Sequence, residues 1–139
     1  MILYAMKNLF KVGDQKTYLK KVNPADMAAF HGQVVHKVCS TFALARDFEW
    51  TSRLFFIEMK EADEEGVGTH LSIDHFGPAF VGEEIIFTAT VEEINGMNLT
   101  CRIEATTSGR LVAKGRTAQK MIKKQKLREI FSNREDRSA

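Results

Sequence analysis

The longest regular pattern of apolar residues along the chain lies between residues 41 and 61. Apolar side chains recur there at spacings of three and four, the period of one face of an α-helix. The series is Leu44, Phe48, Thr51, Phe55 and Met59, flanked by Ala45, Ser52 and Phe56. No glycine or proline interrupts the segment, and the Thr41 hydroxyl is placed to cap its start. We therefore expect a long helix whose broad apolar face is covered by another element, most simply a β-sheet.

The rest of the chain has the shorter period of β-strands. Alternating and β-branched residues occur weakly in residues 16–22 and more strongly in four runs after the helix. These runs are residues 67–76, 83–94, 98–107 and 110–122. Asn95-Gly96 and Ser108-Gly109 separate the last three runs and are typical of tight hairpin turns. Residues 23–40 have no clear period, and their VVHKVCS segment fits either a short strand or a loop. The order of elements predicts an α+β domain in which one antiparallel sheet of about five strands wraps around the helix.

The size and cysteine content limit the kind of protein this is. A chain of 139 residues fits one domain, and no apolar run approaches the about 18 residues of a membrane span. The apolar N-terminus lacks the basic residues and the cleavage site of a secretory signal. Cys39 and Cys101 cannot form a disulfide framework, so we expect reduced thiols in the cytoplasm. The histidine and cysteine spacings do not fit a metal site.

The positive charge of the chain is concentrated at its C-terminus. Residues 120–139 hold seven basic and three acidic residues, a net charge of +4, while the whole chain carries +2. We interpret residues 1–125 as the folded domain and residues 126–139 as a basic tail that forms a solvated terminal helix. The tail lacks interleaved aromatic residues and any nucleic-acid-binding module, so we expect no nucleic-acid partner.

Glu49 is the most unusual polar residue of the predicted helix, because it lies between Phe48 and Trp50. One interpretation is an exposed carboxylate that pairs with Arg53 one turn later. The other is a partly desolvated carboxylate with a raised pKa, able to act as a base or a nucleophile. The sequence leaves both open.

Two histidines fall in the first strand after the predicted helix. His70 and His75 are five residues apart, so their side chains leave the strand on opposite faces. Gly68 precedes them and indicates a close approach of the strand backbone to the helix. Glycine-rich phosphate loops and serine-elbow motifs are missing from the sequence, which argues against nucleotide hydrolysis, dinucleotide redox chemistry and serine-elbow hydrolysis.

The order and spacing of these residues resemble a known family. The segments TFALARDFEW, VGTHLSIDHFGPAFVGEEI and GRTAQKMI are similar to those of the hotdog-fold thioesterases typified by fluoroacetyl-CoA thioesterase. In that family a threonine precedes a glutamate by eight residues, and a V/L-G-T-x-x-x-V/I-x-H pattern follows. Here Thr41 precedes Glu49 by eight residues, and Gly68 precedes His75 by seven. The resemblance covers about residues 12–125 and implies the hotdog fold.

The resemblance also implies a function and a site. It implies hydrolysis of a small or medium acyl thioester, carried by CoA or by an acyl carrier protein, without a cofactor. Glu49 is the implied catalytic carboxylate, His75 moves protons, and Thr41 hydrogen-bonds the carboxylate or, as a weaker alternative, attacks the thioester. Backbone N–H groups at Gly68 and Thr69 bind the acyl carbonyl or the oxyanion. The site lies between two protomers, so a homodimer with a sheet continued across both chains, or a higher homo-oligomer, is expected.

One departure from the family separates this chain from the fluoroacetate specialists. The last predicted strand carries Thr117-Ala118-Gln119 where the family often has His-x-Arg. Fluoroacetyl-CoA is therefore not the expected substrate. The alternative function is a non-catalytic acyl-CoA-binding or regulatory hotdog protein, since this fold also binds acyl-CoA without cleaving it.

Overall fold

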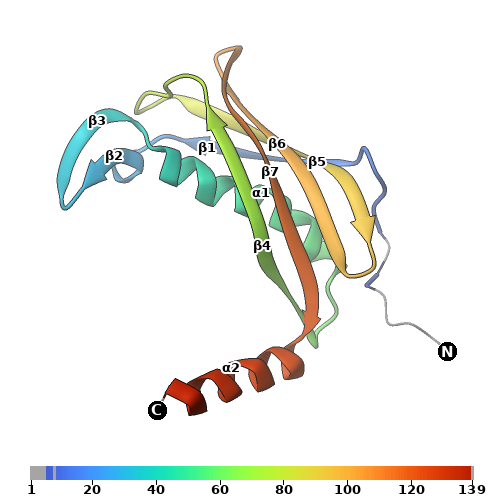
Figure 1. Ribbon diagram of the computed structural model, residues 1–139. Coiled ribbons are helices and arrows are strands. Elements are labelled where there is room, and N and C mark those ends of the chain that lie inside the picture. Colours follow the sequence, from blue (N-terminus) through green and yellow to red (C-terminus); the bar gives the residue numbers. More distant parts are fainter. Residues whose placement is uncertain (1–5, 8, 139) are drawn as a thin grey trace.

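The computed structural model describes residues 6, 7 and 9–138, and its centre is one curved antiparallel sheet around a helix (Figure 1). The five strands lie in the order β1-β5-β6-β7-β4. Their bounds are β1 Gln15–Lys21, β4 Glu64–His75, β5 Glu84–Asn95, β6 Asn98–Thr107 and β7 Arg110–Lys123. The helix α1, Thr41–Met59, lies in the concave face of this sheet (Figure 1). The predicted α+β arrangement of one long helix and about five strands is confirmed.

The apolar series of α1 faces the sheet as its period predicts. Leu44, Phe48 and Phe55 are fully buried, and the rings of Phe48 and Phe87 meet edge to face with centroids 6.0 Å apart. The helix ends two residues earlier than expected. Its N-cap is Ser40 rather than Thr41, because Ser40 has the extended backbone of a cap and its hydroxyl accepts the backbone N–H of Ala43 at 3.0 Å.

The two hairpins differ from each other in how well the sequence predicts them. Ser108 and Gly109 form the β6–β7 turn, and both have the positive φ, 49° and 75°, that a two-residue hairpin of this type requires. The β5–β6 turn is instead Gly96-Met97, because Asn95 still pairs with Asn98 in the ladder. The predicted Asn95-Gly96 turn is thus wrong by one residue.

Residues 23–40 form a small unit outside the main sheet. The 3-10 helix η1, Pro24–Asp26, leads into a separate hairpin of β2, Met27–Phe30, and β3, Gln33–Cys39. The strand alternative for VVHKVCS is therefore right. The β2–β3 register is irregular at two places, which explains why the sequence shows no clean alternation.

A cluster of four charged side chains, whose two carboxylates are buried, fastens this unit to the domain. Lys20 Nζ lies 3.0 Å from Asp26 Oδ1 and 3.2 Å from Asp47 Oδ2, and Arg46 contacts the same two carboxylates. Burial alone would raise the pKa of Asp26. The Asn23 backbone N–H and the Lys20 and Arg46 side chains outweigh it and hold this pKa below its usual value.

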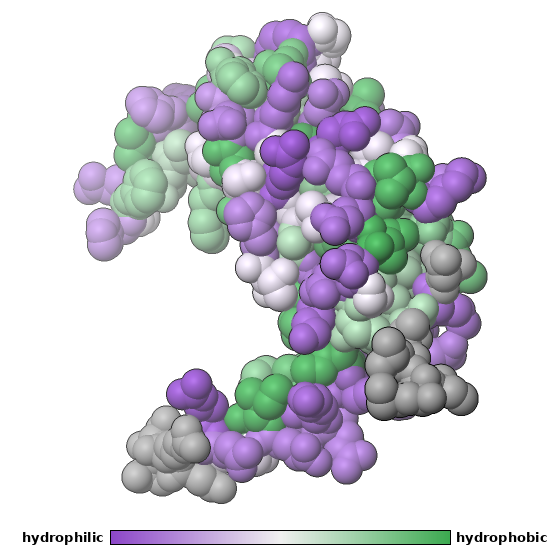
Figure 2. Space-filling model, turned by 45° about the vertical axis from the view of Figure 1, so that its right-hand side comes forward, coloured by the Kyte–Doolittle hydropathy of each residue, from purple (hydrophilic) through white to green (hydrophobic). Residues whose placement is uncertain are grey.

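The C-terminal helix α2, Lys124–Ser138, extends away from the sheet (Figure 1). It begins two residues before the expected boundary of the tail. Ile130 and Phe131 are 42% and 56% exposed, so the large apolar side chains of this helix are mostly uncovered in one chain. Figure 2 shows an open recess between α2 and the rest of the molecule. In the described part of the chain, neither helix has the length and apolar character needed to cross a bilayer.

Candidate functional site

Thr41 and His75 form a hydrogen-bonded pair at the start of α1. The Thr41 hydroxyl lies 2.8 Å from His75 Nδ1, and His75 Nε2 lies 2.8 Å from the Gly77 carbonyl oxygen. A carbonyl only accepts, so Nε2 carries the proton and donates to Gly77. In neutral His75 the Nδ1 atom is then an acceptor, and the Thr41 hydroxyl donates to it. A hydroxyl that donates to a base, which is itself oriented by a third group, is the arrangement of an activated nucleophile.

The cap at Ser40 leaves the Thr41 hydroxyl available for this contact. A capping hydroxyl is occupied by a backbone N–H of the first turn. Because Ser40 takes that role, Thr41 is the first helical residue, and its exposed side chain turns toward β4. Ser40 thus caps the helix, and Thr41 hydrogen-bonds His75.

Glu49 faces the same strand as Thr41, two turns further along the helix. A Cβ atom built on Gly68 would lie 3.3 Å from Glu49 Oε1, which confirms the close approach predicted for this glycine. A Cβ atom built on Gly66 would likewise lie 2.5 Å from the Phe56 ring. The start of β4 therefore lies beside the second half of α1 and its end beside the start of α1.

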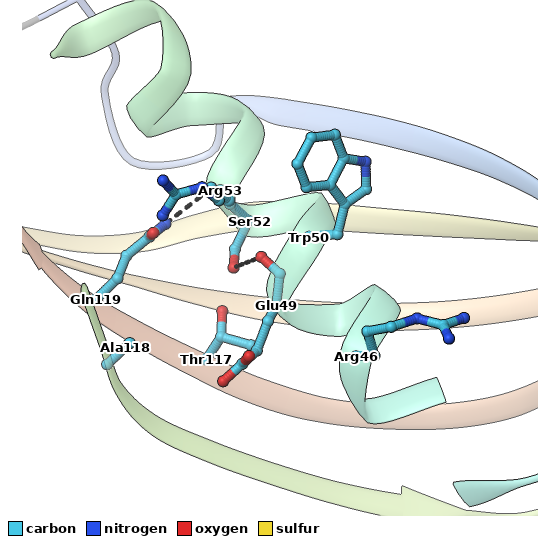
Figure 3. Close-up of a pocket in the computed structure, with 9 residues that line it drawn as sticks. Arg46, Glu49, Trp50, Ser52, Arg53, Thr117, Ala118 and Gln119 are labelled. Atoms are coloured by element: carbon cyan, nitrogen blue, oxygen red, sulfur yellow. Dashed lines mark hydrogen bonds between the residues drawn. The ribbon is translucent and has the colours of Figure 1, made fainter. Parts of the chain in front are cut away.

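Glu49 borders a cavity of about 220 Å³ between α1 and β7 (Figure 3). Its lining residues are Arg46, Glu49, Trp50, Ser52, Arg53, Gly68, Thr117, Ala118 and Gln119. The Glu49 side chain is exposed in one chain. In the described part of the chain it forms no ion pair with Arg53, which instead donates to Glu65 at 2.6 Å and to the Gly66 carbonyl at 3.1 Å. The simple pairing of Glu49 with Arg53 is therefore wrong.

Glu65, the carboxylate that Arg53 contacts in place of Glu49, is stabilised in its ionised form by this contact. Burial acts to raise the pKa of Glu65, but the Arg53 guanidinium and the Gly66 backbone N–H lower it more, so the pKa lies below its usual value. The strongest partner of Arg53 is thus on β4, and Glu49 keeps its carboxylate directed at the cavity.

Thr69 and His70 have positions that the alternation of the strand does not predict. The β4–β7 register shifts between Gly68 and His70, so Thr69 is an extra residue without a ladder partner. It is exposed, and Gly68 rather than Thr69 lines the cavity. After this bulge the alternation holds. His70 is exposed, while His75 turns toward α1, which confirms the predicted opposite faces.

The predicted site residues fall into two groups in one chain. Thr41 and His75 form one group, and Glu49 and Gly68 form the other. The eight residues from Thr41 to Glu49 correspond to about 12 Å along the helix axis. That separation is too long for both groups to act on one thioester carbon, because reacting atoms must lie about 3 Å apart.

Sequence reasoning did not assign the side chains of β7 that close the cavity. Gln119 Nε2 donates to the Ser52 carbonyl at 2.8 Å, and Thr117 lies beside Glu49 (Figure 3). Their positions in an alternating strand put them on the same inward face, two residues apart. That alternation was the available signal, but it does not distinguish cavity-lining residues from core residues.

Comparisons with known proteins identify the family and the fold of the chain. The fluoroacetyl-CoA-specific thioesterase family, FlK, matches residues 22–125. No curated protein matches the sequence. Among solved structures, the chain is similar to a thioesterase superfamily member from Thermus thermophilus, at 26% identity and a TM-score of 0.87, over 91% of this chain and 94% of that one.

Two further structures share the fold at lower identity. A hot-dog-like protein from Thermanaerovibrio acidaminovorans has 21% identity and a TM-score of 0.84, over 91% of this chain and 94% of that one. A variant of the fluoroacetyl-CoA-specific thioesterase has 19% identity and a TM-score of 0.83, over 92% of this chain and 99% of that one. Because the family match spans more than half of the sequence, the chain belongs to the fluoroacetyl-CoA-specific thioesterase family and is a thioester hydrolase with the hotdog fold.

Proposed function

We propose that this protein hydrolyses small or medium acyl-CoA thioesters at a site formed by Thr41, Glu49 and His75, with Gly68 and Thr69 binding the substrate. The observation that carries the proposal is the hydrogen bond between Thr41 Oγ1 and His75 Nδ1, with the other ring nitrogen fixed on Gly77. Thioester hydrolysis needs a nucleophile, a proton acceptor and donors for the oxyanion. These residues supply all three.

Glu49 is the catalytic carboxylate of this proposal, acting on water or by direct attack on the thioester carbonyl carbon. In the water route, Glu49 takes one water proton as the oxygen bonds to the acyl carbon, and His75 accepts the other at Nδ1 and passes it to the thiolate as the C–S bond breaks. In the direct route, Glu49 displaces the thiolate to form a mixed anhydride, and His75 accepts a proton from the water that then cleaves this anhydride. Thr41 holds that nitrogen through its hydroxyl until the substrate arrives. The backbone N–H groups of Gly68 and Thr69, at the bulge of β4, are the donors for the acyl oxygen.

A homodimer unites the two groups of residues. β4 is 12 residues long and lies at an edge of the sheet, where an unpaired strand is available to a second chain. If two copies of β4 pair antiparallel about a twofold axis between Leu71 and Ser72, Gly68 lies opposite the partner's His75. Each Glu49 then approaches the partner's Thr41. Phe42 and Phe76, beside the Thr41–His75 pair, are 82% and 61% exposed, which favours burial by the second copy.

The test of the proposed function is thiol release from a panel of acyl-CoAs and acyl carrier protein thioesters. Glu49→Gln keeps the shape of the side chain and removes the base, so turnover should fall by at least about 100-fold. His75→Ala should also lower turnover, with His70→Ala as the control on the opposite face of the strand. Melting temperatures of the variants should stay near wild type. Wild-type turnover in Glu49→Gln would reject the assignment and favour the acyl-CoA-binding alternative.

A mixing experiment tests the shared site. Thr41→Ala and Glu49→Gln homodimers are each expected to be nearly inactive. In a mixed dimer one site carries both substitutions and the other carries none. Random exchange of subunits should therefore restore about a quarter of wild-type activity. If the site lies within one chain, mixing restores nothing.

The cytoplasm is the proposed location. Cys39 and Cys101 are buried and free. Burial raises the pKa of Cys39 to about 11 and that of Cys101 to about 12, so both thiols remain protonated and unreactive. Buried unpaired thiols of this kind suit a reducing compartment.

A further inference from the structure

The hydroxyl of Thr117 is the one buried side-chain oxygen or nitrogen without a hydrogen-bond partner among the described residues. Thr117 is 2% exposed, and it lines the cavity next to Glu49 (Figure 3). Buried polar groups almost always have a partner, and an exception at a cavity wall indicates a ligand group that completes it.

The neighbouring polar side chains do not satisfy this hydroxyl. The Ser52 hydroxyl has one proton, and it is directed at backbone carbonyl oxygens. Ser52 Oγ lies 3.0 Å from the Glu49 carbonyl oxygen and 3.3 Å from the Phe48 carbonyl oxygen. The carboxamide of Gln119 is fixed by the bond from its Nε2 to the Ser52 carbonyl at 2.8 Å. Ser52 and Gln119 are thus already hydrogen-bonded, and the Thr117 hydroxyl between α1 and β7 is left without a partner.

The charges around the cavity argue against an anionic occupant. Arg46 is engaged by Asp26 and Asp47, and Arg53 by Glu65. The remaining charge that faces the cavity is the Glu49 carboxylate. A second carboxylate beside it would be repelled, whereas an uncharged hydroxyl or carbonyl group would not.

The size of the cavity favours a short group. Its volume of about 220 Å³ lies below the ~300–1,000 Å³ of sites that hold drug-sized ligands. A long acyl chain would also leave the Thr117 hydroxyl buried against hydrocarbon without a partner.

We infer that the cavity between α1 and β7 selects short, uncharged acyl groups that carry an oxygen substituent, and that the Thr117 hydroxyl recognises this oxygen. The inference rests on the proposed function and names the substrate class for the same site. It makes Thr117 a specificity-determining residue, while Glu49 and His75 carry the reaction. A site built to hydrogen-bond a substrate oxygen discriminates against the analogue that lacks it.

The experiment compares 3-hydroxybutyryl-CoA with butyryl-CoA, which differ by one hydroxyl group. Wild-type protein should prefer the hydroxylated substrate in kcat/KM by about tenfold or more. Thr117→Val replaces the hydroxyl by a methyl group of similar size. The variant should lose most of that preference, keep its activity on butyryl-CoA, and melt at a higher temperature than wild type because an unpartnered polar group has been removed.

Thr107→Val is the matched control, because Thr107 is equally buried but donates to the Glu84 carbonyl at 2.7 Å on the far side of β6. It should melt at a lower temperature and leave the substrate preference unchanged. An unchanged preference in Thr117→Val, or an equal loss on both substrates, would overturn the inference. Absence of turnover on every thioester in wild type would instead reject the proposed function.

Discussion

Replacing Gly68 by alanine would place a methyl group 3.3 Å from Glu49 Oε1. That distance is a few tenths of an ångström shorter than ordinary contact, so the two groups must separate. The neighbour is the end of a flexible side chain, and the Glu49 carboxylate will move before the strand does. Gly68→Ala is therefore a perturbation of the position of one functional group.

The expected loss follows from the size of that displacement. A misplacement of about 1 Å at a reacting group costs about 100-fold in rate, so a few tenths of an ångström should lower kcat by about 3- to 10-fold. Stability should be unchanged or slightly higher. Gly68 is outside the positive-φ region, and alanine restricts the unfolded chain more than glycine does, by about 0.5–1 kcal/mol.

Gly66→Ala is the matched control on the same strand. A Cβ atom there would lie 2.5 Å from the ring of Phe56, which is buried in the core. Overpacking of this kind costs about 1–3 kcal/mol, so this variant should melt earlier but keep its kcat well below its melting temperature. Steady-state thiol release and thermal melts on both variants separate the effects. Full turnover in Gly68→Ala would refute a fixed position of Glu49 in the reaction.

Two further predictions concern stability. Asp26→Asn removes a buried carboxylate whose pKa is lower in the folded than in the unfolded chain. The ionised carboxylate stabilises the fold at pH values above its unfolded pKa of about 3.8, and this stabilisation is lost as the pH falls through the folded pKa. Urea unfolding should show a loss of about 3 kcal/mol at pH 7 and a shallower decline below pH 4 than in wild type, and equal curves at all pH values would contradict this. Deletion of residues 132–139 should leave the melting temperature and turnover nearly unchanged, since chain ends tolerate loss; aggregation or inactivity of the truncated chain would show that α2 is tied to the fold or the site.

The sequence predicts best the elements whose period is long and uninterrupted. The helix period between residues 41 and 59 identifies the core face, and every member of its apolar series is buried. The β6 strand, residues 98–107, has the predicted bounds. In both elements the apolar residues recur over several periods, so a single residue that departs from the pattern does not obscure the prediction.

Local choices among similar residues are harder to predict. Ser40 and Thr41 both have a capping hydroxyl, and the backbone conformation decides between them. The bulge at Thr69 inserts one residue into β4, and no residue type in VGTHLS requires it. The ion cluster around Asp26 and Asp47 joins residues far apart in the chain, so periodicity carries no signal of it.

The proposed catalytic residues could be singled out only through their spacing, since the chemistry of each is ambiguous alone. Glu49 has an ordinary alternative as a surface carboxylate paired with Arg53; the structure removes that pairing, because Arg53 bonds to Glu65, but leaves the Glu49 side chain exposed in one chain. His75 has an ordinary alternative as a strand histidine, and its two hydrogen bonds give it a defined tautomer. The contacts of Glu49 and His75 in the folded chain therefore narrow their possible roles further than their residue types do.

The exposure of Glu49 links the catalytic proposal to the dimer. A carboxylate that attacks or activates water benefits from a site that excludes bulk solvent, yet Glu49 is exposed in one chain. The cavity beside it is lined in part by Gly68 of β4, which lies at an edge of the sheet. A second copy paired along β4 would add its side chains next to Gly68 and bring in the Thr41–His75 pair that lies about 12 Å away along its own helix. The proposed contact would then supply both the desolvation and the missing groups. If the protein proves to be a monomer at the concentrations where it is active, neither requirement is met, and Glu49 loses its catalytic role together with the shared site.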